Sequence, residues 1–409
     1  MTTLSCPGNP NQFETPFLGL APFLRTSVEG VDLRPFGKAM LEQAEQYPAD
    51  AELWMNLSVV MQCLGQRDVG LTIQSLALQQ KRVFLLAAAL QPARLRLLVL
   101  SVPGDISVNT PLDCLLENSD IDLVFYYVSP DAPLAFPLPD HDAVYVGISE
   151  SEENRALLAS LDRALAHWPK PVINQPRHIP STGRDTASRL LQDAPGLLIP
   201  PTLQVARSTL LDVAAGSVAP AERIAGCDFP LIVRPVGSQA GRDLEKIERP
   251  EELDAYLRKV GDAEFFVSRF IDYRSEDGLF RKYRVALIDG QPYACHMGIS
   301  SNWMIHYVNA GMYEDAQKRD EEAAFMERFG DFAQRHRAAL EAICQRTQLD
   351  YLCIDCAETQ AGELLIFEID HTMVVHAMDP ELLFPYKQVH MKKVENAFRD
   401  FLFRLTTAG

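Results

Sequence analysis

The sequence predicts a mixed fold, α/β in its first half and α+β in its second, behind a run of N-terminal helices. Three patterns predict it. Apolar residues recur at helical spacing from about Phe36 to Leu90. Strand-like and helical segments then alternate between residues 95 and 174, which is typical of a doubly wound parallel sheet. From Phe229 onward, strands, short helices and hairpin signals are mixed, which favours an α+β unit.

The length and composition limit the number of domains and the kinds of partner that we expect. With 409 residues the chain exceeds the ~250–300 residues at which a single core stops growing, so we expect two or three cores. The formal net charge of −17 argues against a nucleic-acid partner, although a local basic cleft could still bind a smaller anion. No apolar run approaches the ~20 residues of a spanning helix, and the N-terminus has no signal-peptide pattern. We expect a cytoplasmic protein without a membrane partner, with its eight cysteines reduced.

The N-terminal region divides into two parts. Residues 1–34 are rich in Pro, Gly and Thr and are expected to be an irregular lead-in. The apolar spacing is helical over Leu53–Leu64, breaks at Gly65–Asp68, and is expected to resume over Ala77–Leu90. The helices resemble a degenerate tetratricopeptide-like hairpin. Because one or two such units cannot usually stand alone, they are expected to pack on the rest of the chain.

The strongest chemical signal is a pair of apolar strand-like runs that flank a turn at Gly362. Strand side chains alternate faces, so Glu368 and Asp370 share one face. If the turn is a two-residue loop, Asp355 lies directly opposite Glu368, with Cβ atoms about 5 Å apart. Like charges so close are destabilising unless a cation lies between them, and Mg²⁺ prefers such hard oxygen ligands. We therefore predict a metal site at these three carboxylates; the alternative is a solvated acidic strand face.

A strand that runs into a loop of small residues, Phe229–Arg242, is the second signal. Gly237, Ser238 and Gly241 would let backbone N–H groups approach an anion, and Arg234 at the end of the strand supplies positive charge. The loop has neither a Walker lysine nor a dinucleotide fingerprint, so an ordinary flexible turn is the alternative.

A basic hairpin follows, turning at Asp289-Gly290. Lys282 and Arg284 share a face of its first strand, and exposed solubilising charges are the alternative reading for both. His306 and Asn309 are polar residues among apolar ones. The alternative for His306 is a histidine that is exposed or hydrogen-bonded within the fold, and the alternative for Asn309 is an ordinary turn residue.

The order of these pieces resembles the ATP-grasp superfamily, and most closely its glutathione-synthetase and ribosomal-protein-S6-modification branch. A strand ending in arginine, a small-residue loop, an apolar strand, a basic hairpin, a long helix expected at Glu321–Gln348 and an Asp…Glu-x-Asp hairpin follow one another. Pro200-Pro-Thr202 is similar to the PPT connection of the family, and Val233-Arg-Pro235 to its VKP motif. The resemblance covers about residues 170–395.

The resemblance implies a division into an irregular and helical region (1–93), a Rossmann-like domain (94–175) and an ATP-grasp domain (176–409) with a lid at about 205–268. It also implies ATP and Mg²⁺ as cofactors. The residues expected at the nucleotide are Arg184, Arg234, Gly237, Ser238, Gly241, Lys282 and a hinge of Ser268, Arg269, Phe270 and Ile271. Arg284, Asn309 and His306 are the expected catalytic residues, and Asp355, Glu368 and Asp370 the expected metal ligands.

Four positions depart from the pattern of the family. Arg184 and Arg234 stand where phosphate-binding lysines are usual, and a guanidinium fork cannot take the same position as an ammonium. Arg269 stands where the hinge commonly has Glu, and Asp370 replaces the usual Asn. Together these departures leave room for an unusual acceptor, or for ATP binding without the reaction.

By this resemblance we expect an ADP-forming ligase that activates a carboxylate as an acyl phosphate and joins it to an amine. The expected partners are small-molecule or peptide carboxylates and amines, with Gly104–Thr110 as a candidate substrate loop or a plain connection. Two alternatives stay open: a degenerate ATP-binding regulatory or interaction module, and a kinase acting on a small molecule. The oligomeric state is also open, with a homodimer as the commonest assembly.

Overall fold

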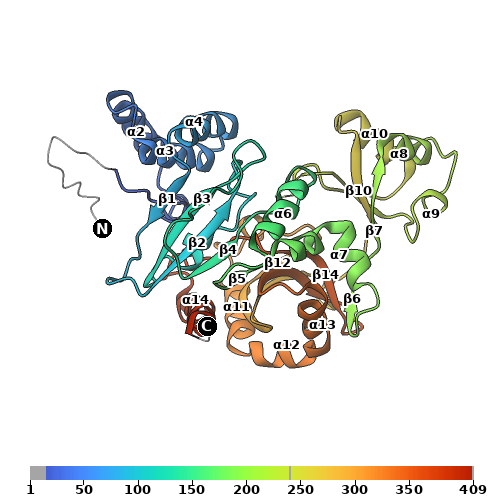
Figure 1. Cartoon of the computed structure of the whole chain (residues 1–409). Coiled ribbons are helices and arrows are strands. Elements are labelled where there is room, and N and C mark those ends of the chain that lie inside the picture. Colours follow the sequence, from blue (N-terminus) through green and yellow to red (C-terminus); the bar gives the residue numbers. More distant parts are fainter. Residues whose placement is uncertain (1–14, 239–240, 408–409) are drawn as a thin grey trace.

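The computed structural model describes residues 15–238 and 241–407, as N-terminal helices, a mostly parallel sheet, an antiparallel sheet and a mostly antiparallel sheet (Figure 1). The predicted combination of α/β and α+β organisation is confirmed. None of the described helices has the length and apolar character needed to cross a membrane.

The helical region stands at one end of the molecule (Figure 1). It comprises α1 (Ala21–Val28), α2 (Arg34–Gln46), α3 (Ala51–Cys63) and α4 (Arg67–Gln80). Asp50 caps α3 by accepting a hydrogen bond from the backbone N–H of Leu53, which satisfies a donor at the helix start. α3 and α4 pack on each other as a helical hairpin, and its likeness to a tetratricopeptide unit stays a prediction.

Two expectations for this region are wrong. Residues 21–28 form α1 within the expected irregular lead-in, whose first part, residues 1–14, lies outside the described chain. The helix expected to run to Leu90 ends at Gln80, and Val83–Leu86 forms strand β1. A short apolar run fits a helix and a buried strand equally well, and here its pairing with the neighbouring sheet decides the outcome.

The parallel sheet has the strand order β1-β3-β2-β4-β5. Its strands are β1, β2 (Leu95–Ser101), β3 (Ile121–Tyr127), β4 (Ala143–Val146) and β5 (Val172–Ile173), with β1 as an antiparallel edge. The short helix α5 (Leu112–Leu115) follows β2, and α6 (Glu152–Leu165), capped by Ser151, lies between β4 and β5. The predicted alternation of strands and helices is confirmed.

A four-stranded antiparallel sheet, in the order β7-β10-β8-β9, forms a separate lobe at the right of Figure 1. Its elements are β7 (Thr202–Ala206), α8 (Arg207–Ala214), α9 (Pro220–Arg223), β8 (Leu231–Pro235), β9 (Glu245–Ile247), α10 (Pro250–Lys259) and β10 (Glu264–Arg269). The helices cover one face and enclose a core of their own around Phe265 and Leu253.

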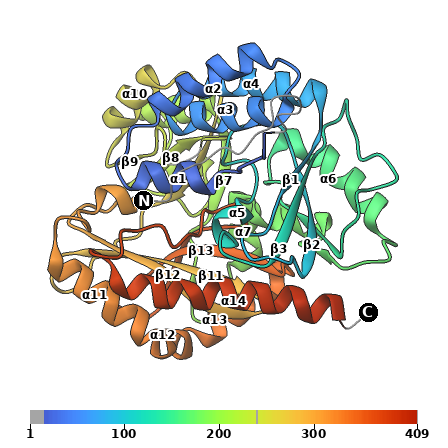
Figure 2. The ribbon, with the colours of Figure 1, turned by 90° about the vertical axis from the view of Figure 1, so that its left-hand side faces the viewer.

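A five-stranded sheet, β12-β11-β13-β14-β6, faces this lobe. Its strands are β6 (Leu197–Leu198), β11 (Phe280–Ile288), β12 (Gln291–Ser300), β13 (Tyr351–Glu358) and β14 (Leu364–Asp370). Two short helices, η1 (Pro176–Thr182) and α7 (Arg184–Leu191), lead into it, and η2 (Tyr307–Asn309) follows β12. The terminal helix α14 (Pro385–Thr407) runs along the sheet against β11 and β12 (Figure 2).

The single helix expected at Glu321–Gln348 is three helices: α11 (Ala316–Glu327), α12 (Phe329–Arg335) and α13 (Arg337–Thr347). The breaks fall at Arg328 and His336, whose backbones leave the helical region. At the second break the His336 ring contacts the Glu358 carboxylate, with Nε2 2.8 Å from Oε1. This tertiary contact has no counterpart in the helical periodicity, so the sequence predicted the helical segment but not its bends.

Candidate functional site

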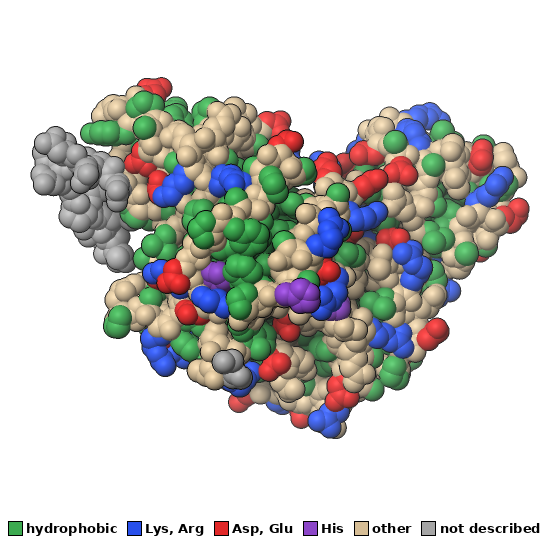
Figure 3. Space-filling view, in the orientation of Figure 1, with side chains coloured by type: hydrophobic (Ala, Val, Ile, Leu, Met, Phe, Trp, Pro, Cys, Tyr) green, Lys and Arg blue, Asp and Glu red, His purple; other side chains and the backbone are tan. Residues whose placement is uncertain are grey.

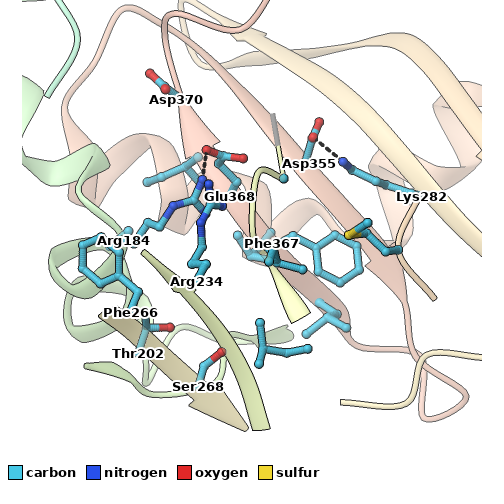
Figure 4. Close-up of a pocket in the computed structure, with 18 of the residues that line it drawn as sticks. Arg184, Thr202, Arg234, Phe266, Ser268, Lys282, Asp355, Phe367, Glu368 and Asp370 are labelled. Carbon is cyan, nitrogen blue, oxygen red and sulfur yellow. Dashed lines mark hydrogen bonds and ion pairs between the residues drawn. The ribbon is translucent and has the colours of Figure 1, made fainter. Parts of the chain in front are cut away.

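A cavity of about 520 Å³ lies between the four-stranded lobe and the five-stranded sheet. Its apolar lining comes from both sheets and includes Ile199, Ile232, Leu244, Phe266, Tyr273, Trp303 and Phe367. Figure 4 shows Ser268 of the hinge at one end and Asp370 at the other. The volume falls within the ~300–1,000 Å³ typical of small-molecule sites.

Besides Arg269 of the hinge, four cationic side chains reach the same cavity. They are Arg184 from the start of α7, Arg234 from β8, and Lys282 and Arg284 from β11. On the outer face in Figure 3, Lys and Arg side chains are scattered among acidic ones instead of forming a continuous basic surface. In a chain of net charge −17, the cavity is therefore a local basic site suited to an anion.

Arg234 is buried and holds the start of the small-residue loop. Its Nε donates to the Ser238 hydroxyl at 3.1 Å, and its Nη2 donates to the Ser238 carbonyl oxygen. Burial lowers the pKa of Arg234 to about 10, and the nearby Arg184 adds to the effect, so the guanidinium remains charged at neutral pH. Gly241 adopts a positive φ of 70°, and a Cβ placed there would lie 2.5 Å from Nε2 of His306. Only glycine fits this close approach.

Asp355 is buried and bound by two of the cations. β11 and β13 pair in a register that puts Arg284 opposite Asp355. Arg284 makes a bidentate contact, Nε to Oδ1 at 2.8 Å and Nη2 to Oδ2 at 3.0 Å, while Lys282 Nζ lies 2.7 Å from Oδ2 (Figure 4). Burial alone would raise the pKa of Asp355, but the attraction of Arg284 and Lys282 outweighs it and holds the pKa well below its usual range.

The other two predicted metal ligands have different partners. Glu368 is in register with Asp355, but its carboxylate forms an ion pair with Arg184. Asp370 accepts hydrogen bonds from the backbone N–H and the hydroxyl of Thr372, each at 2.9 Å. Figure 4 shows the Asp370 carboxylate turned away from the other two.

The prediction that the three carboxylates converge is therefore wrong, because each is held by a different partner. Within residues 15–238 and 241–407, no group of three or more His, Cys, Asp or Glu side chains is arranged to hold a metal ion. In this arrangement the carboxylates do not fit a preformed Mg²⁺ site, and their role as metal ligands stays a prediction.

The predicted hinge lines the cavity with Ser268, Arg269, Phe270 and Ile271. Phe270 is enclosed on two sides: Lys246 Nζ lies 4.0 Å from its ring centroid, and Trp303 packs edge-on at 5.7 Å. Its backbone N–H donates to the Pro230 carbonyl oxygen at 2.9 Å, which ties the hinge to the strand before the small-residue loop.

His306 lines the cavity, whereas Asn309 is not among the lining residues. Burial lowers the pKa of His306, and the nearby Lys282 lowers it further. The Asn309 side chain is occupied locally, since its Oδ1 accepts the backbone N–H of His306 at 3.0 Å. Gly237 and Ser238 also fall outside the lining residues, so of the three loop residues expected at the nucleotide only Gly241 lines the cavity. The catalytic role of Asn309 stays a prediction.

Ile106 and Ser107, from the candidate substrate loop after β2, are part of the cavity lining. Thr182 and Thr372 join them from η1 and from the segment after β14. Sequence reasoning missed both threonines, since neither stands in a motif.

A buried charge cluster behind η2 was also missed. Lys387 Nζ lies 3.0 Å from Asp379 Oδ2 and 3.5 Å from Glu322 Oε1. The Tyr307 hydroxyl donates to Glu322 Oε2 at 2.7 Å, so the cluster anchors the turn that carries His306. The only signal in the sequence is a lysine among aromatic residues near the start of the last helix.

No protein-family model and no curated protein sequence matches this chain. Many solved structures are similar to it in part, and three of them are as follows. The D-alanine–D-alanine ligase of Bacillus anthracis, complexed with ATP, is 13% identical, with 77% of this chain and 99% of that chain covered and a TM-score of 0.47. An ATP-grasp RimK-domain protein from Sphaerobacter thermophilus is 16% identical, with 75% and 99% covered and a TM-score of 0.41. The VanG D-Ala:D-Ser ligase of Enterococcus faecalis is 14% identical, with 75% and 99% covered and a TM-score of 0.45. Because these structures are similar to the chain only in part and at low identity, the cavity is the basis for assigning a function.

Proposed function

We propose that the protein is an ATP-dependent ligase that joins a carboxylate to an amine and releases ADP and phosphate. One observation carries the proposal: five cationic side chains and an apolar surface line a single cavity between two sheets. An apolar surface suits the faces of a purine ring, and clustered cations suit a chain of phosphates. The order of motifs along the chain supports the same reaction.

The reaction needs charge stabilisation more than it needs a dedicated nucleophile. A carboxylate oxygen of the first substrate attacks the γ-phosphorus of ATP, and ADP leaves. The nitrogen of the amine then attacks the acyl carbon. Phosphate departs with the electron pair of the C–O bond, and the nitrogen loses a proton. Arg234, Arg284 and Lys282 are the groups we assign to the charge that develops on the phosphoryl and acyl oxygens.

Arginine in place of the usual lysine fits this assignment at Arg234. Two of its donor nitrogens, Nε and Nη2, already bind Ser238. Among the described residues, its remaining nitrogen, Nη1, has no hydrogen-bond partner, so it can bind a phosphate oxygen while the loop is held. The three donors of a lysine share one nitrogen, so an ammonium cannot reproduce the separate positions of the fork.

A Mg²⁺ requirement stays a prediction of this proposal, because the carboxylates do not fit a preformed metal site. The ion could enter with the phosphates of the nucleotide, as Mg²⁺ commonly does. No step above is derived through it.

Calorimetric titration of ATP, with and without Mg²⁺, tests the nucleotide site. We expect ATP to bind the wild type and to bind Glu368→Ala with altered affinity, since that variant frees Arg184. Glu248→Ala is the control, because this carboxylate lies outside the cavity and its side chain is 52% exposed. Absence of binding at millimolar ATP would overturn the proposal.

Release of ADP from ATP then tests the chemistry. A ligase releases ADP in proportion to amide formed and needs both an acid and an amine. Stoichiometric phosphorylation of a hydroxyl compound with no amine present would instead identify a kinase.

A further inference from the structure

The three carboxylates in the cavity differ in their counter-charge. Asp355 is bound by Arg284 and Lys282, and Glu368 by Arg184. Asp370 has no such partner: along the described chain, no Lys or Arg nitrogen lies within 4.0 Å of it. The Asp370 side chain is 19% exposed and lines the cavity. Burying most of an ionised carboxylate without a nearby cation costs free energy, unless a bound ligand supplies the positive charge.

The neighbouring His371 does not supply it. Its side chain is fully buried, and Nε2 lies 3.0 Å from the carbonyl oxygen of Ile148. A carbonyl can only accept, so Nε2 carries the proton of this bond. Nδ1 is buried without a hydrogen-bond partner and lies 3.6 Å from Asp370 Oδ1, too far for a hydrogen bond. Asp370 therefore lines the cavity with hydrogen bonds from Thr372 but, among the described residues, without a Lys or Arg partner, while the buried His371 lies outside the lining.

The surroundings are those of a small polar ligand. Ser107 and Thr182 provide hydroxyl groups in the lining of the same cavity, and Ile106 is an apolar member of that lining. Glu150, which follows β4, lies near Asp370: burial raises the pKa of Glu150, its ion pair with Arg155 opposes the rise, and the charge of Asp370 adds to it. Apart from Arg269 of the hinge, the lining cations contact other residues: Arg184, Lys282 and Arg284 contact the other two carboxylates, and Arg234 contacts Ser238.

We propose that Asp370 binds the ammonium group of the amine substrate, so that this end of the cavity selects a small organic primary amine. The inference rests on the proposed ligase function and deepens it. An ammonium provides three N–H donors and a positive charge, which match the carboxylate and the hydroxyl oxygens. A metal ion would need several carboxylates turned toward one point, and Asp370 is turned away from Asp355 and Glu368 (Figure 4).

The test compares Asp370→Asn with the wild type. Asparagine keeps the size of the side chain and an oxygen acceptor for Thr372 but removes the charge. Glu363→Gln is the matched control, since this carboxylate stands beside the start of the same strand and outside the cavity lining. The probes are methylamine, ethanolamine and 1,3-diaminopropane, each paired with the corresponding alcohol, titrated calorimetrically with and without saturating ADP.

We expect at least one amine to bind the wild type and the control, at least tenfold more tightly than it binds Asp370→Asn, while the alcohols do not bind. The affinity for ATP, with and without Mg²⁺, should be the same in all three proteins. Equal amine affinity in Asp370→Asn, or no amine bound by the wild type, would overturn the inference.

A loss of Mg²⁺-dependent ATP binding in Asp370→Asn with unchanged amine affinity would make Asp370 a metal ligand instead. Failure of the wild type to bind ATP would count against the ligase itself, and the amine titration without nucleotide would still decide the role of Asp370.

Discussion

Asp355 lies directly opposite Glu368 in the β13–β14 hairpin, although the turn between the strands is one residue longer than a two-residue loop. The backbone N–H of Thr359 donates to the Glu363 carbonyl, so three residues form the loop. A bulge at Phe367 then shifts the register by one residue and restores the pair. The same bulge places Phe367 in the lining of the cavity. Two departures from a regular hairpin therefore cancel at the carboxylates.

Replacing Asp355 with Asn tests the buried ion pair. Lys282 and Arg284 would be left as two like charges in a buried site, and breaking such a cluster typically costs about 3–5 kcal/mol. We expect urea unfolding at pH 7 to show a loss of this size. Asp272→Asn is the control, because the Asp272–Arg274 pair is more than half exposed and its loss should change stability by about 0.5 kcal/mol or less. Equal stability of the two variants would show that Asp355 is not the counter-charge of these cations.

The buried cluster behind η2 predicts a rescue. Lys387→Met leaves Glu322 and Asp379 as unpaired buried carboxylates and should cost about 3–5 kcal/mol. Adding Glu322→Gln removes one of them, so the double variant should be more stable than Lys387→Met alone. Both are measured by urea unfolding.

Lys392→Met, on the same helix, is the matched control, since the Lys392 side chain is half exposed and its ion pair with Glu395 should contribute little. A double variant less stable than either single variant would mean that the three charges do not act as a cluster.

The sequence predicted local features well where a short pattern determines them. The alternation of strands and helices follows from periodicity and is confirmed. The opposition of Asp355 and Glu368 is also confirmed, although the turn is longer than the two-residue loop from which it was predicted and a bulge restores the pair. The grouping of Arg234 and Arg284 in one cavity came from the order of motifs, and the structure places both in its lining.

What the sequence could not predict depends on long-range contacts. Val83–Leu86 became a strand because β3 was available to pair with it. The direction of the Asp370 carboxylate depends on Thr372 and on its neighbours across the molecule, and strand alternation alone gave the wrong expectation of convergence. The Glu322–Lys387 contact joins residues 65 positions apart, which no spacing rule relates.

We expect the protonation of His296 to contribute to the pH dependence of stability. This residue lies on β12 in register with Arg284, and its ring centroid is 4.9 Å from that of Tyr307. Burial lowers the pKa of His296 well below its usual value, and the charge of Arg284 adds to the effect. As the pH falls, His296 is protonated in the unfolded chain at a higher pH than in the folded protein. Protonation therefore favours the unfolded chain, and stability falls as the pH drops below the unfolded pKa of about 6.5.

His296→Gln removes that titration. Between pH 7 and pH 5.5 the variant should lose about 1 kcal/mol less unfolding free energy than the wild type, as urea unfolding at the two pH values would show. His167→Gln is the comparison, an exposed histidine that should leave the pH dependence of the wild type in place. Parallel pH profiles for His296→Gln and the wild type would contradict the assignment.

The fork of Arg234 makes the sharpest prediction for nucleotide binding. Two of its nitrogens hold Ser238, and the third is free to bind a phosphate oxygen. Arg234→Lys keeps the charge but provides a single nitrogen, so either the loop or the phosphate loses a charge-assisted hydrogen bond. Such a bond is worth about 1.5–3 kcal/mol, so the dissociation constant for ATP should rise about tenfold or more. Arg258→Lys is the matched control, since Arg258 is exposed on α10 of the same lobe and lies outside the cavity lining. Calorimetry should find its ATP affinity close to that of the wild type. If Arg234→Lys also bound ATP as the wild type does, the hold of Arg234 on Ser238 would have no part in nucleotide binding, and a lysine would serve equally well at this position.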